Sequence, residues 1–118
     1  MLQFIKNMDV KNVEVLEVRN STLDNRVKKI ILQIKNGFNT FKFEITKREL
    51  KYDQLENWDN YIEDFTIKAV FYARNCCKNS PVIILNSENE NDRDEITMVL
   101  KKCLELKGNE IKERLEVL

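Results

Sequence analysis

The 118-residue sequence contains no histidine, only two glycines and a single proline. Without histidine the chain cannot form a Ser-His-Asp triad or a histidine-ligated zinc site, since both depend on the imidazole ring. Two glycines are too few for the glycine-rich loops that bind phosphates and dinucleotides. Three cysteines are too few for a four-cysteine zinc site. We therefore expect the protein to carry no cofactor and no metal.

Long apolar runs are also missing. The longest one, Val82–Leu85, is far shorter than the roughly 20 residues that a helix needs to cross a bilayer. The first residues lack the basic and apolar regions of a signal peptide. Without an export signal, we expect Cys76, Cys77 and Cys103 to be reduced thiols that behave as small buried hydrophobic residues. The sequence thus predicts a cytoplasmic protein with no membrane segment.

The composition is typical of one globular domain over residues 1–118, with 42% hydrophobic and 34% charged residues. The formal net charge is zero, but the charges are unevenly distributed. Residues 1–52 carry 11 Lys and Arg against 6 Asp and Glu, whereas residues 53–118 carry 9 against 14. The chain therefore has a basic first part and an acidic second part.

A β-hairpin is the clearest local signal. The dipeptide Asn36-Gly37 is preferred in two-residue hairpin turns, which predicts strands near residues 27–35 and 38–45. If the turn is centred on this dipeptide, Leu32 faces Phe41, Ile30 faces Phe43, and Lys29 faces Glu44. Another strand is predicted over 13–18, where a change of phase between Val15 and Leu16 indicates either a bulge or a strand covered on both faces. The three strands form an antiparallel meander.

The rest of the chain is interpreted as helix, strand and helix. Apolar residues at spacings of three and four favour a main helix over 60–77, although the alternation from Phe65 to Ala73 is also typical of a strand. Val82–Leu85 predicts a short strand that is buried on both faces. A second helix is predicted at about 92–107 and ended by Gly108, with one apolar stripe formed by Ile96, Val99, Leu100, Cys103 and Leu104. The expected fold is α+β, in the order β-β-β-α-β-α, with the helices packed on one face of the sheet.

This order resembles the core layout of restriction-endonuclease-like nucleases, which carry an acid near the second strand and an E-x-K on the third. The nearest match here is Asp24 followed by Glu44-Ile45-Thr46-Lys47. Lys47 comes one residue late, so in a strand it would lie on the opposite face from Glu44. The resemblance covers residues 24–85 and implies a magnesium-dependent nuclease as one alternative function.

Acidic residues cluster around two aromatic residues in the second part of the chain. The cluster contains no Lys or Arg and consists of Asp53, Glu56, Trp58, Asp59, Tyr61, Glu63 and Asp64. A second acidic run comprises Glu88, Glu90, Asp92, Asp94 and Glu95. Carboxylates beside exposed aromatic rings are typical of surfaces that capture basic partners, although each aromatic residue taken singly is expected to be buried. We expect these seven residues of the first cluster to bind a protein partner with a basic surface.

The leading hypothesis is therefore a non-catalytic protein that binds another protein and inhibits or regulates it, as immunity proteins and antitoxins do. We do not expect nucleic-acid binding, because Glu44 lies among Lys29, Lys35 and Lys42 and no aromatic residues alternate with them. A further alternative is a structural subunit that self-associates through residues 110–118. There Ile111, Leu115 and Leu118 lie on one helical face.

Overall fold

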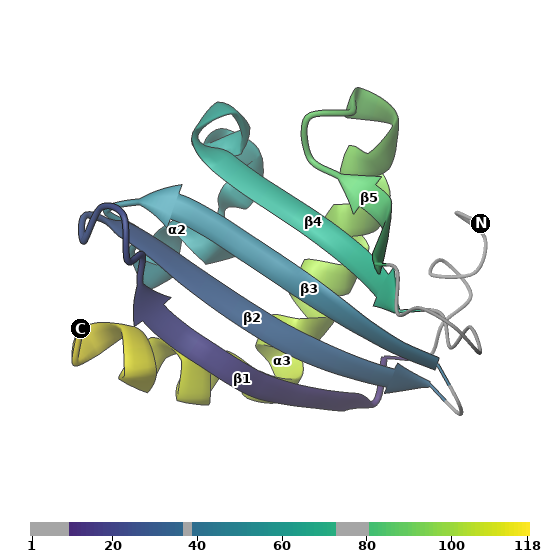
Figure 1. Cartoon of the computed structure of the whole chain (residues 1–118), viewed down its shortest axis with the longest axis horizontal. Coiled ribbons are helices and arrows are strands. Elements are labelled where there is room, and N and C mark those ends of the chain that lie inside the picture. The colour runs from purple at the N-terminus through teal and green to yellow at the C-terminus, as the bar shows by residue number, and fades with distance from the viewer. Residues whose placement is uncertain (1–9, 37–38, 73–80) are drawn as a thin grey trace.

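The computed structural model describes residues 10–36, 39–72 and 81–118 (Figure 1). The strands are β1 (Asn12–Asn20), β2 (Val27–Asn36), β3 (Asn39–Arg48), β4 (Phe65–Tyr72) and β5 (Pro81–Asn86). The helices are α2 (Tyr52–Glu56) and α3 (Arg93–Glu116), and three short 3₁₀ turns are η1 (Trp58–Asn60), η2 (Ile62–Asp64) and η3 (Glu90–Asp92).

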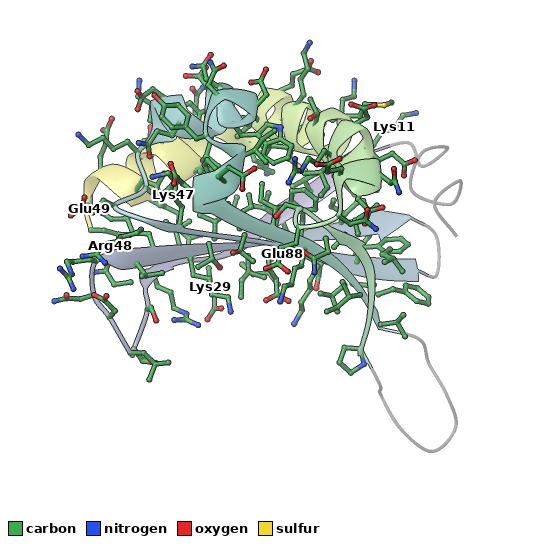
Figure 2. The ribbon with its side chains drawn as sticks, turned by 90° about the horizontal axis from the view of Figure 1, so that it is seen from above. Lys11, Lys29, Lys47, Arg48, Glu49 and Glu88 are labelled. Atoms are coloured by element: carbon green, nitrogen blue, oxygen red, sulfur yellow. The ribbon has the colours of Figure 1, made fainter. Side chains whose placement is uncertain are left out.

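The five strands form one antiparallel sheet in sequence order, β1-β2-β3-β4-β5. Both α2 and α3 cover the same face of this sheet, and no element within the described ranges covers the other face, the open face (Figure 2). The predicted α+β class, the meander of the first three strands and the packing of helices on one face are therefore confirmed. The predicted order is not reproduced in full, because a strand takes the place of the main helix.

The hairpin of β2 and β3 forms, but its register differs from the predicted one by two residues. Ile30 pairs with Ile45, Leu32 with Phe43, and Asn36 with Asn39. A shift of two residues leaves every side chain on the same face, because side chains alternate with a period of two. The apolar residues therefore still face the helices. Lys29 lies opposite Thr46 and reaches Glu44 diagonally, at 3.5 Å.

A bulge interrupts β1 as expected, with the register shift lying between Val15 and Glu17. The extra residue is Leu16, which breaks the strict alternation of the strand. Nη1 of Arg114, on α3, donates a hydrogen bond of 3.0 Å to the carbonyl oxygen of Val15. The far end of the helix is thereby attached to the strand at the irregular point.

The predicted helix over 60–77 is wrong, and the rival strand interpretation is correct for residues 65–72. Ile67 pairs with Ile45 and Ala69 with Phe43, so the apolar residues of β4 join those of β3 on the helix-covered face. Thr66 and Lys68 occupy the opposite face. Pairing along β3 satisfies the backbone of β4 and buries its apolar residues, which favours the period of two over the helical period. Residues 73–77 lie outside the described part of the chain.

Strand β5 is an edge strand and is not buried on both faces as predicted. Val82 is 41% exposed and Ile83 is 52% exposed, whereas Leu85 is buried in the core. A bulge separates the pairs formed by Ala69 and Val70, and the side chain of Asp92 accepts a hydrogen bond of 3.1 Å from the backbone N–H of Asn86. These features, with a proline at the start of the strand, are typical protections of a sheet edge against further pairing.

Helix α3 continues for 24 residues, so the predicted end at Gly108 is wrong. Gly108 lies inside the helix, where a Cβ atom would collide with the hydroxyl oxygen of Tyr52. Its small size therefore permits α2 to approach α3. The continued helix brings Ile111 and Leu115 into the same core as Ile96 and Leu100.

Candidate protein-binding surface

The first acidic cluster lies on α2 and the two 3₁₀ turns that follow it. The side chain of Gln54 accepts a hydrogen bond of 3.0 Å from the backbone N–H of Lys51, which stabilises the first turn of α2. Leu55 is buried and holds this short helix against α3. All five carboxylates of the cluster are exposed: Asp53, Glu56, Asp59, Glu63 and Asp64.

The two aromatic residues of the cluster turn towards the core. Trp58 is only 3% exposed, its ring packs edge-on against Phe65, and its Nε1 donates a hydrogen bond of 2.9 Å to Oγ1 of Thr97. Tyr61 is half-buried and packs against the core. The burial expected for each aromatic residue taken singly is therefore confirmed for Trp58, and the expectation that acids flank exposed aromatic residues is not met there. Instead, this side chain attaches the acidic segment to α3.

The second acidic run includes η3 and the first turn of α3. Glu88, Glu90 and Asp94 are exposed, Glu95 is half-buried and Asp92 is buried. Asp92 is therefore a structural residue, since its carboxylate accepts the hydrogen bond from Asn86 at the sheet edge. The exposed members add negative charge to the surface beside the beginning of α3.

Arg93 joins the two acidic runs. Its Nη2 lies 3.8 Å from Oε1 of Glu63, and its Nε donates a hydrogen bond of 3.0 Å to the backbone carbonyl of Ser87. Together with the bond between Trp58 and Thr97, the contact of Arg93 with Glu63 brings segments 30 to 39 residues apart into one region. We call this region the acidic surface. Its exposed carboxylates belong to Asp53, Glu56, Asp59, Glu63, Asp64, Glu88, Glu90 and Asp94.

A groove of about 510 Å³ lies between α2, η1 and α3, within the acidic surface. Its lining includes the buried residues Leu55, Trp58 and Leu100. Exposed charged groups also line it: Glu56 and Asp59 come from the α2–η1 segment, and Lys101 and Glu105 come from α3. The groove therefore combines apolar side chains with three carboxylates and one ammonium group.

Tyr52 forms another part of the groove wall. Partial burial raises the pKa of its hydroxyl above the usual 10.0, and the negative charge of Glu56 raises this pKa further. The phenol therefore stays neutral around pH 7 and contributes a ring and a hydroxyl group, but no charge, to the groove.

Two residues of the nuclease alternative lie far apart in the structure. Asp24 belongs to the loop between β1 and β2, where its Oδ1 accepts hydrogen bonds from the backbone N–H and side chain of Arg26. These bonds lower the pKa of Asp24 below its usual value. Asp24 precedes the start of β2, where Val27 pairs with Arg48 on β3. Glu44 lies four residues before Arg48 on β3, a separation of about 13 Å along the strand.

Lys47, the lysine of the nuclease alternative, lies on the opposite side of the sheet from Glu44. Figure 2 shows Lys29, the ion-pair partner of Glu44, on the open side of the sheet and Lys47 on the helical side. Lys47 is buried, and its Nζ donates a hydrogen bond of 3.0 Å to the carbonyl of Arg48. Within residues 10–36, 39–72 and 81–118, no three Asp, Glu or Cys side chains are grouped so that they could hold a metal ion.

The predicted basic residues share the open face of the sheet. Lys29, Lys35 and Lys42 lie at alternate positions of paired strands, and Lys68 extends the same face across β4. Glu44 lies among them and forms the ion pair with Lys29. The open face of the sheet thus carries mixed charge with an excess of lysine, on the side opposite the helices.

The predicted self-association seam is not available in the form expected. Ile111 is fully buried and Leu115 is 7% exposed, because both pack in the core of their own chain. Leu118 is 43% exposed and reaches solvent at the end of the chain. The first two residues therefore stabilise the monomer and are not free to contact a second copy.

The α3 wall of the groove was not among the residues predicted to bind a partner. It consists of Thr97, Leu100, Lys101, Leu104 and Glu105. Leu100 and Leu104 were recognised only as part of the apolar stripe of the helix. No local pattern links them to α2, because the contact arises only when both helices pack on the sheet.

Comparison of the chain with protein-family models, with curated proteins and with solved structures finds no match. None of the helices in the described ranges combines the length and apolar character that a bilayer-spanning helix requires.

Proposed function

We propose that this protein is a non-catalytic binding module that captures a basic surface of another protein and thereby inhibits or regulates it. The observation that carries the proposal is the set of exposed carboxylates in residues 53–64 and 88–94, two segments that are linked by the contacts of Glu63 with Arg93 and of Trp58 with Thr97. Summed negative charge accelerates and orients the encounter with a positively charged partner.

The proposed mechanism is occlusion. The acidic surface covers a functional basic site of the partner, such as one that would otherwise bind nucleic acid or another anion. The hydrogen bond between Trp58 and Thr97 and the packing of Leu55 hold the acidic segment on α3. Such preorganisation reduces the conformational entropy lost on binding. The lysine-rich open face of the sheet would be turned away from a basic partner, since like charges repel.

The proposal is tested by charge reversal outside the groove. A pull-down with the wild-type protein from its native cell, followed by mass spectrometry, identifies the partner. The triple variant Asp53→Lys, Glu63→Lys and Asp64→Lys should then slow association with the purified partner by about tenfold or more at low salt. The salt dependence of the rate should also become smaller, because fewer opposite charges steer the encounter.

A matched control variant reverses the same number of charges elsewhere. Glu14 and Glu17 on β1 and Glu113 near the end of α3 are exposed and lie outside the acidic surface, so their replacement by lysine should change the association rate much less. Circular dichroism confirms that both variants are folded. If the two triple variants bind the partner equally well, the acidic surface is not the binding surface.

A further inference from the structure

The groove between α2 and α3 has the features of a socket for one long side chain. Leu55 and Leu100 are each 1% exposed, and Trp58 is 3% exposed, so the residues beneath the groove already belong to the packed core. The half-buried side chains of Tyr52 and Leu104 also line the groove and provide apolar surface that can cover the aliphatic part of a bound side chain. The volume of the groove, about 510 Å³, lies within the range of ordinary ligand pockets.

The charges around the opening select the occupant. In the described part of the chain, neither Glu56 nor Asp59 forms an ion pair, so both carboxylates of the α2–η1 wall are available to a cation. On the α3 wall, Glu105 lies 3.5 Å from Lys102. The remaining charged group is Lys101, which repels a positive ligand. The groove therefore carries a net negative charge above an apolar floor.

We infer that this groove binds an exposed arginine side chain of the partner protein, a conclusion that rests on the proposed function. The three-carbon stem would pack on Tyr52 and Leu104, the half-buried apolar residues of the lining, and the guanidinium group would reach Glu56 and Asp59. Arginine suits the site better than lysine, because its planar guanidinium donates several hydrogen bonds to carboxylates at once and also packs on aromatic rings. The acidic surface steers the partner, and the groove fixes its position.

The chain contains its own reporter of occupancy. Trp58 is the only tryptophan and it lines the groove, so a bound side chain should change its fluorescence and the NMR signal of its indole N–H. The probe is the peptide acetyl-Gly-Arg-Gly-amide, with the citrulline peptide as its uncharged counterpart of nearly the same shape. We expect the arginine peptide to shift the amide signals of Thr97, Leu100 and Leu104, and the citrulline peptide to bind at least about fivefold more weakly.

Variants of the rim test the assignment without disturbing the core. Glu56→Gln with Asp59→Asn should weaken binding of the arginine peptide by about fivefold or more. The control pair Glu88→Gln and Glu90→Gln removes the same charge outside the groove and should change binding less than twofold. Lys101→Gln should strengthen binding, because it removes the repelling charge. Equal binding of both peptides, or equal binding by both double variants, would overturn the inference.

Other occupants give different results. If spermidine produces the groove shifts and the arginine peptide does not, the site binds a small cation and the inference is wrong. The purified partner separates this inference from the proposed function. If the charge-reversal variant loses partner binding and the Glu56→Gln, Asp59→Asn variant binds fully, the acidic surface binds the partner but the groove does not hold its arginine. If the arginine peptide binds in the groove and charge reversal does not affect partner capture, the groove binds arginine but the acidic surface is not the binding surface.

Discussion

The contact between Gly108 and Tyr52 allows a sharp test of how α2 is positioned. In an ordinary helix, replacing glycine with alanine raises stability by about 1 kcal/mol, because alanine loses less backbone entropy. Here the new Cβ atom would overlap the hydroxyl oxygen of Tyr52, and the next nearest atom, Cζ of the same ring, would be 3.5 Å away. The conflict therefore involves one hydroxyl group and no backbone atom.

We expect Gly108→Ala alone to be neutral or destabilising. Displacing the Tyr52 ring from its place against α3 costs about 1–2 kcal/mol, which offsets the gain in helix propensity. In the Tyr52→Phe background the hydroxyl is absent and the new Cβ atom meets only ordinary van der Waals neighbours. There the same substitution should stabilise the protein by about 1 kcal/mol. The coupling between the two sites is thus about 1–2 kcal/mol.

Urea unfolding of the four proteins in this double-mutant cycle measures the coupling. The fluorescence of buried Trp58 follows the transition, and circular dichroism at 222 nm follows it independently. Coincident transitions would justify a two-state treatment. If Gly108→Ala stabilises the wild-type and the Tyr52→Phe proteins equally, the Tyr52 hydroxyl does not contact Gly108 and α2 does not approach α3 closely at this position.

Two further predictions concern buried groups. Thr97→Val removes the acceptor for the Trp58 indole N–H and should lower the free energy of unfolding by about 1–3 kcal/mol. Thr97→Ser keeps a hydroxyl acceptor and should retain most of the wild-type stability. Equal urea midpoints for the Thr97→Val and wild-type proteins would contradict the role of this bond. Burial raises the pKa of the Cys103 thiol from 9.0 to about 12, so in a Cys76→Ser, Cys77→Ser background we expect iodoacetamide at pH 8.5 to modify it in urea but not in the native protein, as mass spectrometry would show. The pKa of the Cys103 thiol is higher in the native than in the unfolded protein. Burial of the neutral thiol therefore contributes fully to stability below about pH 9, and this contribution decreases as the pH rises towards 12. Rapid alkylation of the native protein would contradict the burial of Cys103.

Much of the sheet was predictable from the sequence because the side-chain period of a strand survives small errors. The predicted hairpin register was displaced by two residues, yet Leu32 and Phe43 still lie on the buried face and Lys29 still reaches Glu44. The bulge in β1 was visible as a change of phase. The helical stripe from Ile96 to Leu104 was also visible, since tertiary packing buries that same stripe.

The sequence was ambiguous wherever two periods fitted the same residues. Phe65, Ile67, Ala69 and Phe71 suit a strand and, with their neighbours, also a helix. The pairing partner on β3 decided between them, and a pairing partner is a long-range property. Gly108 resembled a helix end for a similar reason, because its function is to admit Tyr52, a residue 56 positions earlier in the chain.

The acidic residues, the apolar faces of most strands and the missing catalytic groups could all be read from the amino-acid sequence. Three features became visible only after folding: the hydrogen bond from Trp58 to Thr97, the contact of Arg93 with Glu63, and the groove between α2 and α3. Charge and periodicity are local properties of the chain. A surface or a groove, in contrast, exists only after distant segments have packed on the same sheet.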